Sequence, residues 1–162
     1  EVCLADVSSW QDVLKLPPSC DLVIHAAGNV KDGLLLKHSK QDAAMVLRPK
    51  VRGAVHLLKK FPLARFLGFS STSTVFGSAG QASYAYANAF LSAMMPTVYW
   101  GGWAGAGMAE DLDIAELPGE YFIPIHVGME CLGKVLDAST TASAAPIVLD
   151  CEWDAFRQNQ TQ

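Results

Sequence analysis

Residues 66–71 read Phe-Leu-Gly-Phe-Ser-Ser, and residues 84–88 read Tyr-Ala-Tyr-Ala-Asn. The apolar run that precedes the two serines is typical of a buried strand, so Ser71 stands at the carboxyl end of that strand. Tyr84 and Asn88 are one helical turn apart, and a helix over this stretch presents both on one face. A strand followed by a helix is the repeating unit of α/β folds, whose sites lie at the carboxyl ends of strands. We therefore expect Ser71 and Tyr84 to meet at one site.

The rest of the chain has the same alternation. Apolar runs predict strands at 2–5, 21–24, 97–100 and 146–149, and helical periodicity predicts helices at 42–60 and 127–136. This order favours an α/β fold with a doubly wound parallel sheet. The length permits a single domain, which we place at residues 1–156, with a frayed polar tail at 157–162.

The two hydroxyls suggest a chemistry. If Ser71 and Tyr84 both reach one substrate oxygen, they stabilise the negative charge that this oxygen gains when a hydride attacks its carbon. Tyr84 can also deliver the proton, provided that a nearby cation lowers its pKa from about 10.

Lys50 is the candidate for that cation. At about 100° per residue, it falls at the edge of an apolar stripe on the helix predicted at 42–60. The stripe consists of Leu47, Val51, Ala54, Val55 and Leu58. Pro49 removes a backbone donor, so it should bend this helix and free a carbonyl. Two interpretations of Lys50 remain open, a snorkelling side chain that reaches water or the cation beside Tyr84.

Composition excludes several classes of protein. The 162 residues carry a net charge of −4, and 51% are hydrophobic, which favours a globular protein and disfavours a nucleic-acid-binding surface. The sequence has no signal-peptide pattern and no apolar run of membrane-spanning length, so we expect a cytoplasmic location. The cysteines are scattered singly, which indicates reduced, buried thiols and no metal site. They are Cys3, Cys20, Cys131 and Cys151.

Several segments, taken in order, resemble the ketoreductase domain of polyketide synthases and animal-type fatty acid synthases, in the short-chain dehydrogenase/reductase superfamily. They are residues 25–28 (His-Ala-Ala-Gly) with 32–33, then 46–53, 69–71, 80–88 and 100–109, and in the tail 128–129, Leu132 and 150–153. The ordinary superfamily pattern has lysine four residues after the tyrosine, where this chain has Asn88. In the ketoreductase family the lysine instead precedes the serine, as Lys50 does here.

The resemblance implies a Rossmann-like fold and the NADPH-dependent reduction of a β-ketoacyl thioester carried on an acyl carrier protein, beside neighbouring synthase domains. It also implies a role for each polar site residue. Tyr84 is the proton donor, Ser71 orients the carbonyl, Lys50 lowers the pKa of Tyr84, and Asn88 holds the lysine or a relay water.

The cofactor residues are implied by the same resemblance. Asp6 and Val7 are expected against the adenine side of NADPH. Ala26, Ala27 and Gly28 are expected near the nicotinamide ribose. Independently of the resemblance, the glycines at 101–107 lack the spacing of a dinucleotide-binding turn, and we interpret this segment as a flexible loop over the active site.

The sequence departs from the family at two places. No glycine-rich turn, which cradles the cofactor pyrophosphate, precedes Asp6, so we expect a partial fold that binds NADPH weakly by itself. The helix of Tyr84 is two to three turns short at residues 94–96, through a natural deletion or a join in the sequence. A non-catalytic structural remnant of a synthase is therefore the alternative, and a free-standing dehydrogenase is a third. Stereochemistry stays open, because residues 30–32 (Val-Lys-Asp) match one class only partly and Phe76 replaces the tryptophan of the other.

Overall fold

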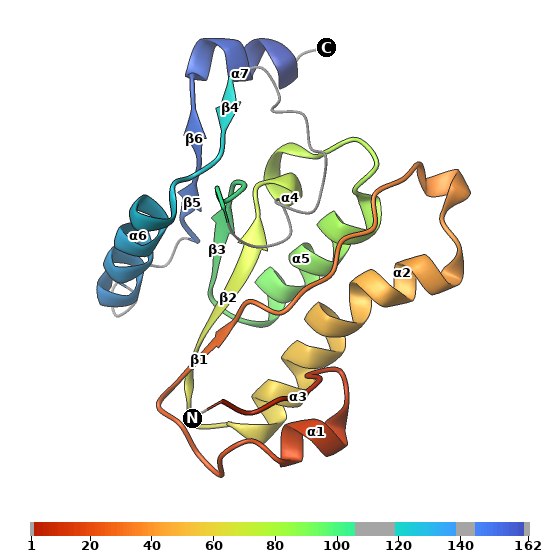
Figure 1. The fold of residues 1–162 in the computed structure, drawn as a ribbon, viewed down its shortest axis with the longest axis vertical. Coiled ribbons are helices and arrows are strands. Elements are labelled where there is room, and N and C mark those ends of the chain that lie inside the picture. Colours follow the sequence, from red (N-terminus) through yellow and green to blue (C-terminus); the bar gives the residue numbers. More distant parts are fainter. Residues whose placement is uncertain (1, 106–118, 139–144, 161–162) are drawn as a thin grey trace. The chain divides into compact units, whose positions relative to one another are not determined.

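The computed structural model describes residues 2–105, 119–138 and 145–160 (Figure 1). The chain forms two compact units, residues 1–97 and residues 98–162, which are described separately.

The first unit is built around two parallel strands, β1 (Leu22–His25) and β2 (Arg65–Ser71). Leu22 lies opposite Arg65 and His25 opposite Gly68, so both strands run toward the same edge. Ser71 ends β2 at that edge, as the sequence predicts. The parallel pair with helical connections confirms the α/β class.

Helices surround this pair of strands. They are α1 (Trp10–Leu14), η1 (Leu35–Lys37), α2 (Lys40–Leu47), η2 (Arg48–Arg52), α3 (Gly53–Lys60), α4 (Ser73–Phe76) and α5 (Ala82–Met94). The core of the unit includes the following clusters of buried residues. One is Val23, Leu57 and Phe61, and another is Ala54, Leu91 and Met95. Helix α5 ends at Met94 and the next strand begins at Thr97, which confirms the short junction.

The helix predicted at 42–60 is interrupted where Pro49 stands. Residues 48–52 form a π-helix between α2 and α3, which confirms that the proline disturbs the regular helical ladder. A π-turn adds a residue to the turn, and it therefore rotates the later residues of the helix relative to a 100° repeat. As a result Val55, expected on the buried stripe, is exposed, while Lys50 is buried rather than at the edge.

The strand predicted at 2–5 is wrong. These residues carry no strand, and both Val2 and Leu4 are almost fully exposed. A strand needs a hydrogen-bonded neighbour, and in the part of the chain that the structure describes nothing pairs with this segment. Cys3 and Cys20 are free and exposed, so the expectation of buried thiols also fails for these two.

The remaining elements lie in the second unit, except that β3 begins at Thr97, the last residue of the first unit. They are β3 (Thr97–Trp100), β4 (Glu120–Tyr121), α6 (Ile125–Ala138), β5 (Ile147–Val148), β6 (Asp150–Cys151) and α7 (Trp153–Gln160). Strands β3 and β5 are parallel, and β4 and β6 are antiparallel. Gly128 is required on α6, because a Cβ there would lie 2.5 Å from the Trp103 ring.

Helix α7 corrects one boundary. The polar tail expected from residue 157 begins inside this helix, which continues to Gln160. Residues 106–107 of the expected loop at 101–107, and residues 106–109 of the family-like segment 100–109, lie outside the described residues. Over the ranges that are described, no helix has the length and apolarity needed to cross a membrane.

Candidate active site

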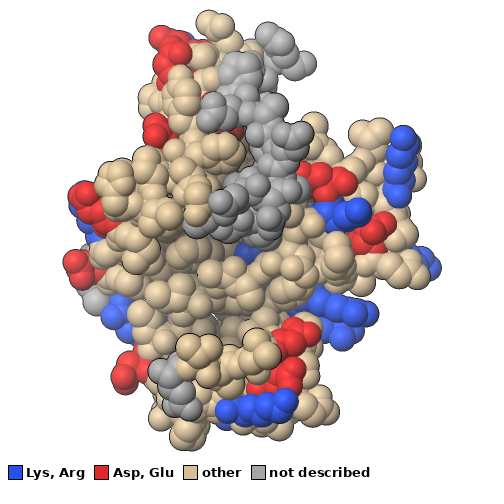
Figure 2. Space-filling view, in the orientation of Figure 1, with Lys and Arg blue, Asp and Glu red and all other residues tan. Residues whose placement is uncertain are grey.

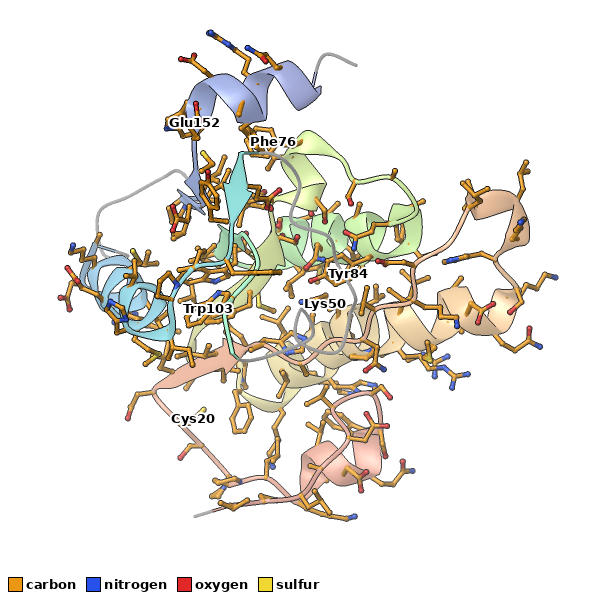
Figure 3. All side chains as sticks on the ribbon, turned by 45° about the horizontal axis from the view of Figure 1, so that its top comes forward. Cys20, Lys50, Phe76, Tyr84, Trp103 and Glu152 are labelled. Carbon is orange, nitrogen blue, oxygen red and sulfur yellow. The ribbon has the colours of Figure 1, made fainter. Side chains whose placement is uncertain are left out.

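Lys50 is a buried cation in the first unit. Its side chain is only 2% exposed, and its Nζ donates to the main-chain oxygen of Phe69 at 2.7 Å. Burial lowers the pKa of Lys50 to about 8, because water no longer stabilises the ammonium. The snorkelling interpretation is therefore wrong, since the head group points inward to β2 and not to solvent. Figure 3 shows Lys50 and Tyr84 reaching from η2 and α5.

Two of the polar residues predicted from the sequence, Ser71 and Asn88, lie beside the Tyr84 side chain. Its hydroxyl interacts with the side chains of Asn88 and Ser71, and both interactions lower its pKa. The Ser71 hydroxyl also accepts from Ser73, through the backbone N–H at 3.2 Å and the side-chain hydroxyl at 3.0 Å. The first turn of α4 thus fixes Ser71 at the end of β2, next to the tyrosine.

The pKa of Tyr84 is raised, whereas we expected a nearby cation to lower it. Burial is the largest influence and raises the pKa above its ordinary value of 10.0, the nearby Asp32 carboxylate raises it further, and hydrogen bonds with Asn88 and Ser71 offset only part of the rise. The Lys50 ammonium donates to the Phe69 carbonyl and is not among the groups that shift this pKa. In this structure Tyr84 is thus a protonated phenol at neutral pH.

Asn88 is fully buried on α5, one turn after Tyr84. Its Nδ2 donates to the Tyr84 main-chain oxygen at 3.0 Å. Its Oδ1 is buried and has no hydrogen-bond partner among the described residues. A buried carbonyl oxygen without a donor costs about 1–3 kcal/mol, so Asn88 Oδ1 is a ready acceptor for a water or a bound group.

A chain of hydroxyls fixes this turn of α5 against β2. Ser92 Oγ lies 3.0 Å from both Ser70 Oγ and the Asn88 main-chain oxygen, and Thr97 Oγ1 donates to Ser92 Oγ at 3.1 Å. Ser70, Ser92 and Thr97 were not among the predicted site residues. For Ser92 the sequence did contain a signal, because it follows Asn88 by four residues, as Asn88 follows Tyr84, and so lies on the same helix face.

His25 is a second buried group that packs against the π-helix. It ends β1 and is almost fully buried. Burial and the nearby Lys50 charge lower the pKa of His25 to about 4, so its imidazole is neutral. A Cβ at Gly53 would lie 3.2 Å from this ring and 2.8 Å from Val7 Cγ2, which explains the glycine there.

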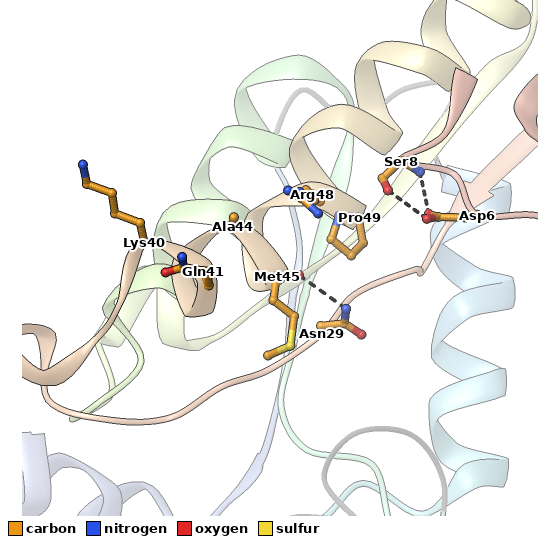
Figure 4. Close-up of a pocket in the computed structure, with 9 residues that line it drawn as sticks. All are labelled: Asp6, Ser8, Asn29, Lys40, Gln41, Ala44, Met45, Arg48 and Pro49. Carbon is orange, nitrogen blue, oxygen red and sulfur yellow. Dashed lines mark hydrogen bonds between the residues drawn. The ribbon is translucent and has the colours of Figure 1, made fainter. Parts of the chain in front are cut away.

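A polar groove lies beside this edge of the unit, between the Asp6 turn and α2 (Figure 4). It encloses approximately 470 Å³, within the usual range of ligand sites, roughly 300–1,000 Å³. Its lining residues are Asp6, Ser8, Asn29, Lys40, Gln41, Ala44, Met45, Arg48 and Pro49. The Asp6 carboxylate accepts from the Ser8 backbone at 2.8 Å and from its hydroxyl at 3.0 Å.

Only one of the predicted cofactor residues is among those that line this groove. Asp6 lines it, whereas Val7 packs in the core cluster of Val23 and Leu57. Residues 26–28 come directly after β1 but are not among the lining residues, and Asn29 takes that place. The described part of the chain contains no cluster of histidine, cysteine or acidic residues that would hold a metal ion.

Replacing Lys50 by methionine is expected to stabilise the fold at neutral pH. The folded-state pKa of about 8 lies below the ordinary 10.5, so the folded form binds its proton less well. This difference costs about 3 kcal/mol at pH values below 8, and the cost disappears as pH rises toward 10.5. After allowance for the lost bond to Phe69, Lys50→Met should gain about 1 kcal/mol at neutral pH.

Chemical unfolding of both forms across this pH range measures the effect. The advantage of Lys50→Met should shrink between about pH 8 and pH 10.5. A constant difference over that range would show that the buried ammonium is not what limits stability.

Comparison with known proteins identifies relatives of this chain. The model of the KR domain family matches residues 4–107. Polyketide synthase GfsA of Streptomyces halstedii is 37% identical over 147 residues, 83% of this chain and 2% of GfsA. Polyketide synthase GfsB of the same organism is 45% identical over 148 residues, 83% of this chain and 3% of GfsB. The chain thus spans a small fraction of these relatives.

Solved structures agree with the sequence relatives. The ketoreductase PlmKR1, from the first module of phoslactomycin biosynthesis in Streptomyces sp. HK803, matches with a TM-score of 0.82 and 27% identity. The match covers 97% of this chain and 41% of PlmKR1. A-type ketoreductases from a modular polyketide synthase match with a TM-score of 0.84 and 25% identity, over 96% of this chain and 37% of theirs. These matches confirm the Rossmann-like fold and its partial extent.

Proposed function

The chain belongs to the KR domain family of polyketide synthases, and from this premise we propose that it carries the catalytic part of an NADPH-dependent reductase. The substrate is a β-ketoacyl thioester on an acyl carrier protein, and the product is the β-hydroxyacyl thioester. The observation that carries the proposal is the cluster around Tyr84, with Ser71 and Asn88 at its side chain and a buried lysine on the adjoining η2.

The polar side chains of the cluster have separate roles. When bound, NADPH supplies the hydride. Ser71 and Tyr84 donate to the substrate carbonyl oxygen, where negative charge develops, and two fixed donors in a buried site stabilise it. Tyr84 then gives up its proton to that oxygen. The raised pKa means that the phenol still holds its proton at neutral pH when negative charge develops on the substrate oxygen, which is the stronger base.

Lys50 and Asn88 support the tyrosine after the proton leaves. A phenolate in a buried site needs a nearby positive charge, and Lys50 supplies one from η2. The unpaired Asn88 Oδ1 accepts from a relay water or from the Lys50 ammonium. These roles argue against a non-catalytic remnant, which has no need to keep a buried lysine at this cost.

The groove at Asp6 fits the adenosine end of the cofactor. Its acidic and amide groups suit the hydrogen-bonding edge of a purine, and Arg48 suits a phosphate oxygen. We propose that the groove binds one end of NADPH only.

An assay of the full-length protein tests the proposal. With a β-ketoacyl thioester bearing a short synthetic thiol, NADPH consumption should match the formation of β-hydroxyacyl thioester. NADH should serve poorly by comparison. Absence of reduction by the folded protein with either cofactor would contradict the proposed reaction.

A further inference from the structure

The segment between β1 and α2 carries an exposed apolar run. Leu34, Leu35 and Leu36 are 63%, 67% and 100% exposed, the last two in η1. Single exposed leucines are common, but three in succession leave a continuous apolar surface in water. Such a run calls for a partner that covers it.

Basic side chains border this run. Lys31, Lys37 and Lys40 are exposed, and none of the three has an ion pair within the described ranges. Figure 2 shows basic side chains at the edge of the molecule over η1 and α2, with acidic ones among them. Two carboxylates lie among these lysines. Asp32 accepts from Gln81 at 3.1 Å, and Asp42 accepts from Ser39 at 2.7 Å and feels the charge of Lys31, so the segment carries three lysines against two acids.

Contacts at both ends fix this segment beside the candidate active site. The Gly33 N–H donates to the Gly80 oxygen at 3.0 Å, and Gln81 Nε2 donates to Asp32. At the other end, Ser83 Oγ lies 3.4 Å from His38 Nδ1. All three contacts reach the residues immediately before Tyr84. The exposed leucines therefore lie next to the helix turn that presents the tyrosine.

We propose that residues 31–40 form the docking surface for the acyl carrier protein, an inference that rests on the proposed function. The leucines would pack on an apolar spot of the carrier, and the lysines would face acidic side chains around that spot. The net charge of the chain is −4, so a basic border is a local departure that steers an acidic partner to this place. From here a flexible thioester arm can reach Tyr84.

The test compares two forms of one substrate in the full-length protein. Leu36→Asp and Lys37→Glu are combined, since both side chains are exposed and lie outside the catalytic cluster. The KM for the carrier-bound β-ketoacyl thioester should rise about tenfold or more. The KM and kcat for the same acyl group on a short synthetic thiol should stay unchanged, because that substrate needs no docking. Higher salt should weaken use of the carrier-bound form in the parent protein.

Leu63→Asp is the matched control, since Leu63 is 98% exposed in the turn between α3 and β2. It should leave both substrates unaffected. If the parent reduces both substrates and the double variant still uses the carrier-bound form normally, the docking surface is wrong while the proposed function stands. A double variant that loses both substrates equally would instead show that the leucines are covered within the protein, which also overturns the proposal. Failure of the parent protein on both substrates would overturn the proposed function itself.

Discussion

Tyr84→Phe in the full-length protein is expected to lower kcat for thioester reduction by roughly 10²–10⁴-fold, the usual contribution of a general acid. The variant loses the hydroxyl that interacts with Ser71 and Asn88 but keeps the ring and its packing. Since the hydroxyl acts on charge that develops in the transition state, the loss should fall on kcat more than on KM. Steady-state kinetics with the short thioester measure both quantities.

Tyr86→Phe provides the control, because Tyr86 lies on the same helix but is exposed. It should reduce as fast as the parent protein. A Tyr84→Phe variant of parental kcat would refute the assignment of Tyr84 as proton donor, whatever its effect on stability.

Ser71→Ala is expected to lower kcat by about 10²–10³-fold, as for removal of one donor to a developing oxyanion. Ser71 also accepts two bonds from Ser73, so its loss can disturb α4 as well. Ser73→Ala separates these effects, because it keeps the Ser71 hydroxyl while removing one of those bonds. We expect a large loss for Ser71→Ala and a small one for Ser73→Ala. Equal losses would mean that Ser71 acts by holding α4 in place.

Much of the first unit was predictable, because its signals are local. The apolar run before Ser71 and the one-turn spacing of Tyr84 and Asn88 are set by strand and helix periodicity. These signals located β2 and α5 within a residue or two. The break at Pro49 was likewise predictable, since a proline removes a ladder bond wherever it stands within a helix.

The wrong predictions have a common cause. Each concerns a property that depends on contacts between elements, which a local sequence pattern does not contain. The sequence could indicate a disturbed helix at Pro49 but not that the disturbance is a π-turn, and so the burial of Lys50 was missed. The strand expected at residues 2–5 failed because strand formation depends on a neighbour, which a local pattern does not reveal. The raised pKa of Tyr84 is a consequence of burial, which outweighs hydrogen bonds that the sequence did anticipate.

Transfer of a label tests the central claim most directly. The full-length protein is given a carrier-bound β-ketoacyl thioester and NADPH that bears deuterium at the transferable position of its nicotinamide ring, and the product is analysed by mass spectrometry. We predict a β-hydroxyacyl thioester with one deuterium on the carbon that bore the ketone, formed by the parent protein and nearly absent with Tyr84→Phe. An unlabelled product, or labelled product formed equally well by Tyr84→Phe, would contradict the proposed hydride transfer and the role of Tyr84.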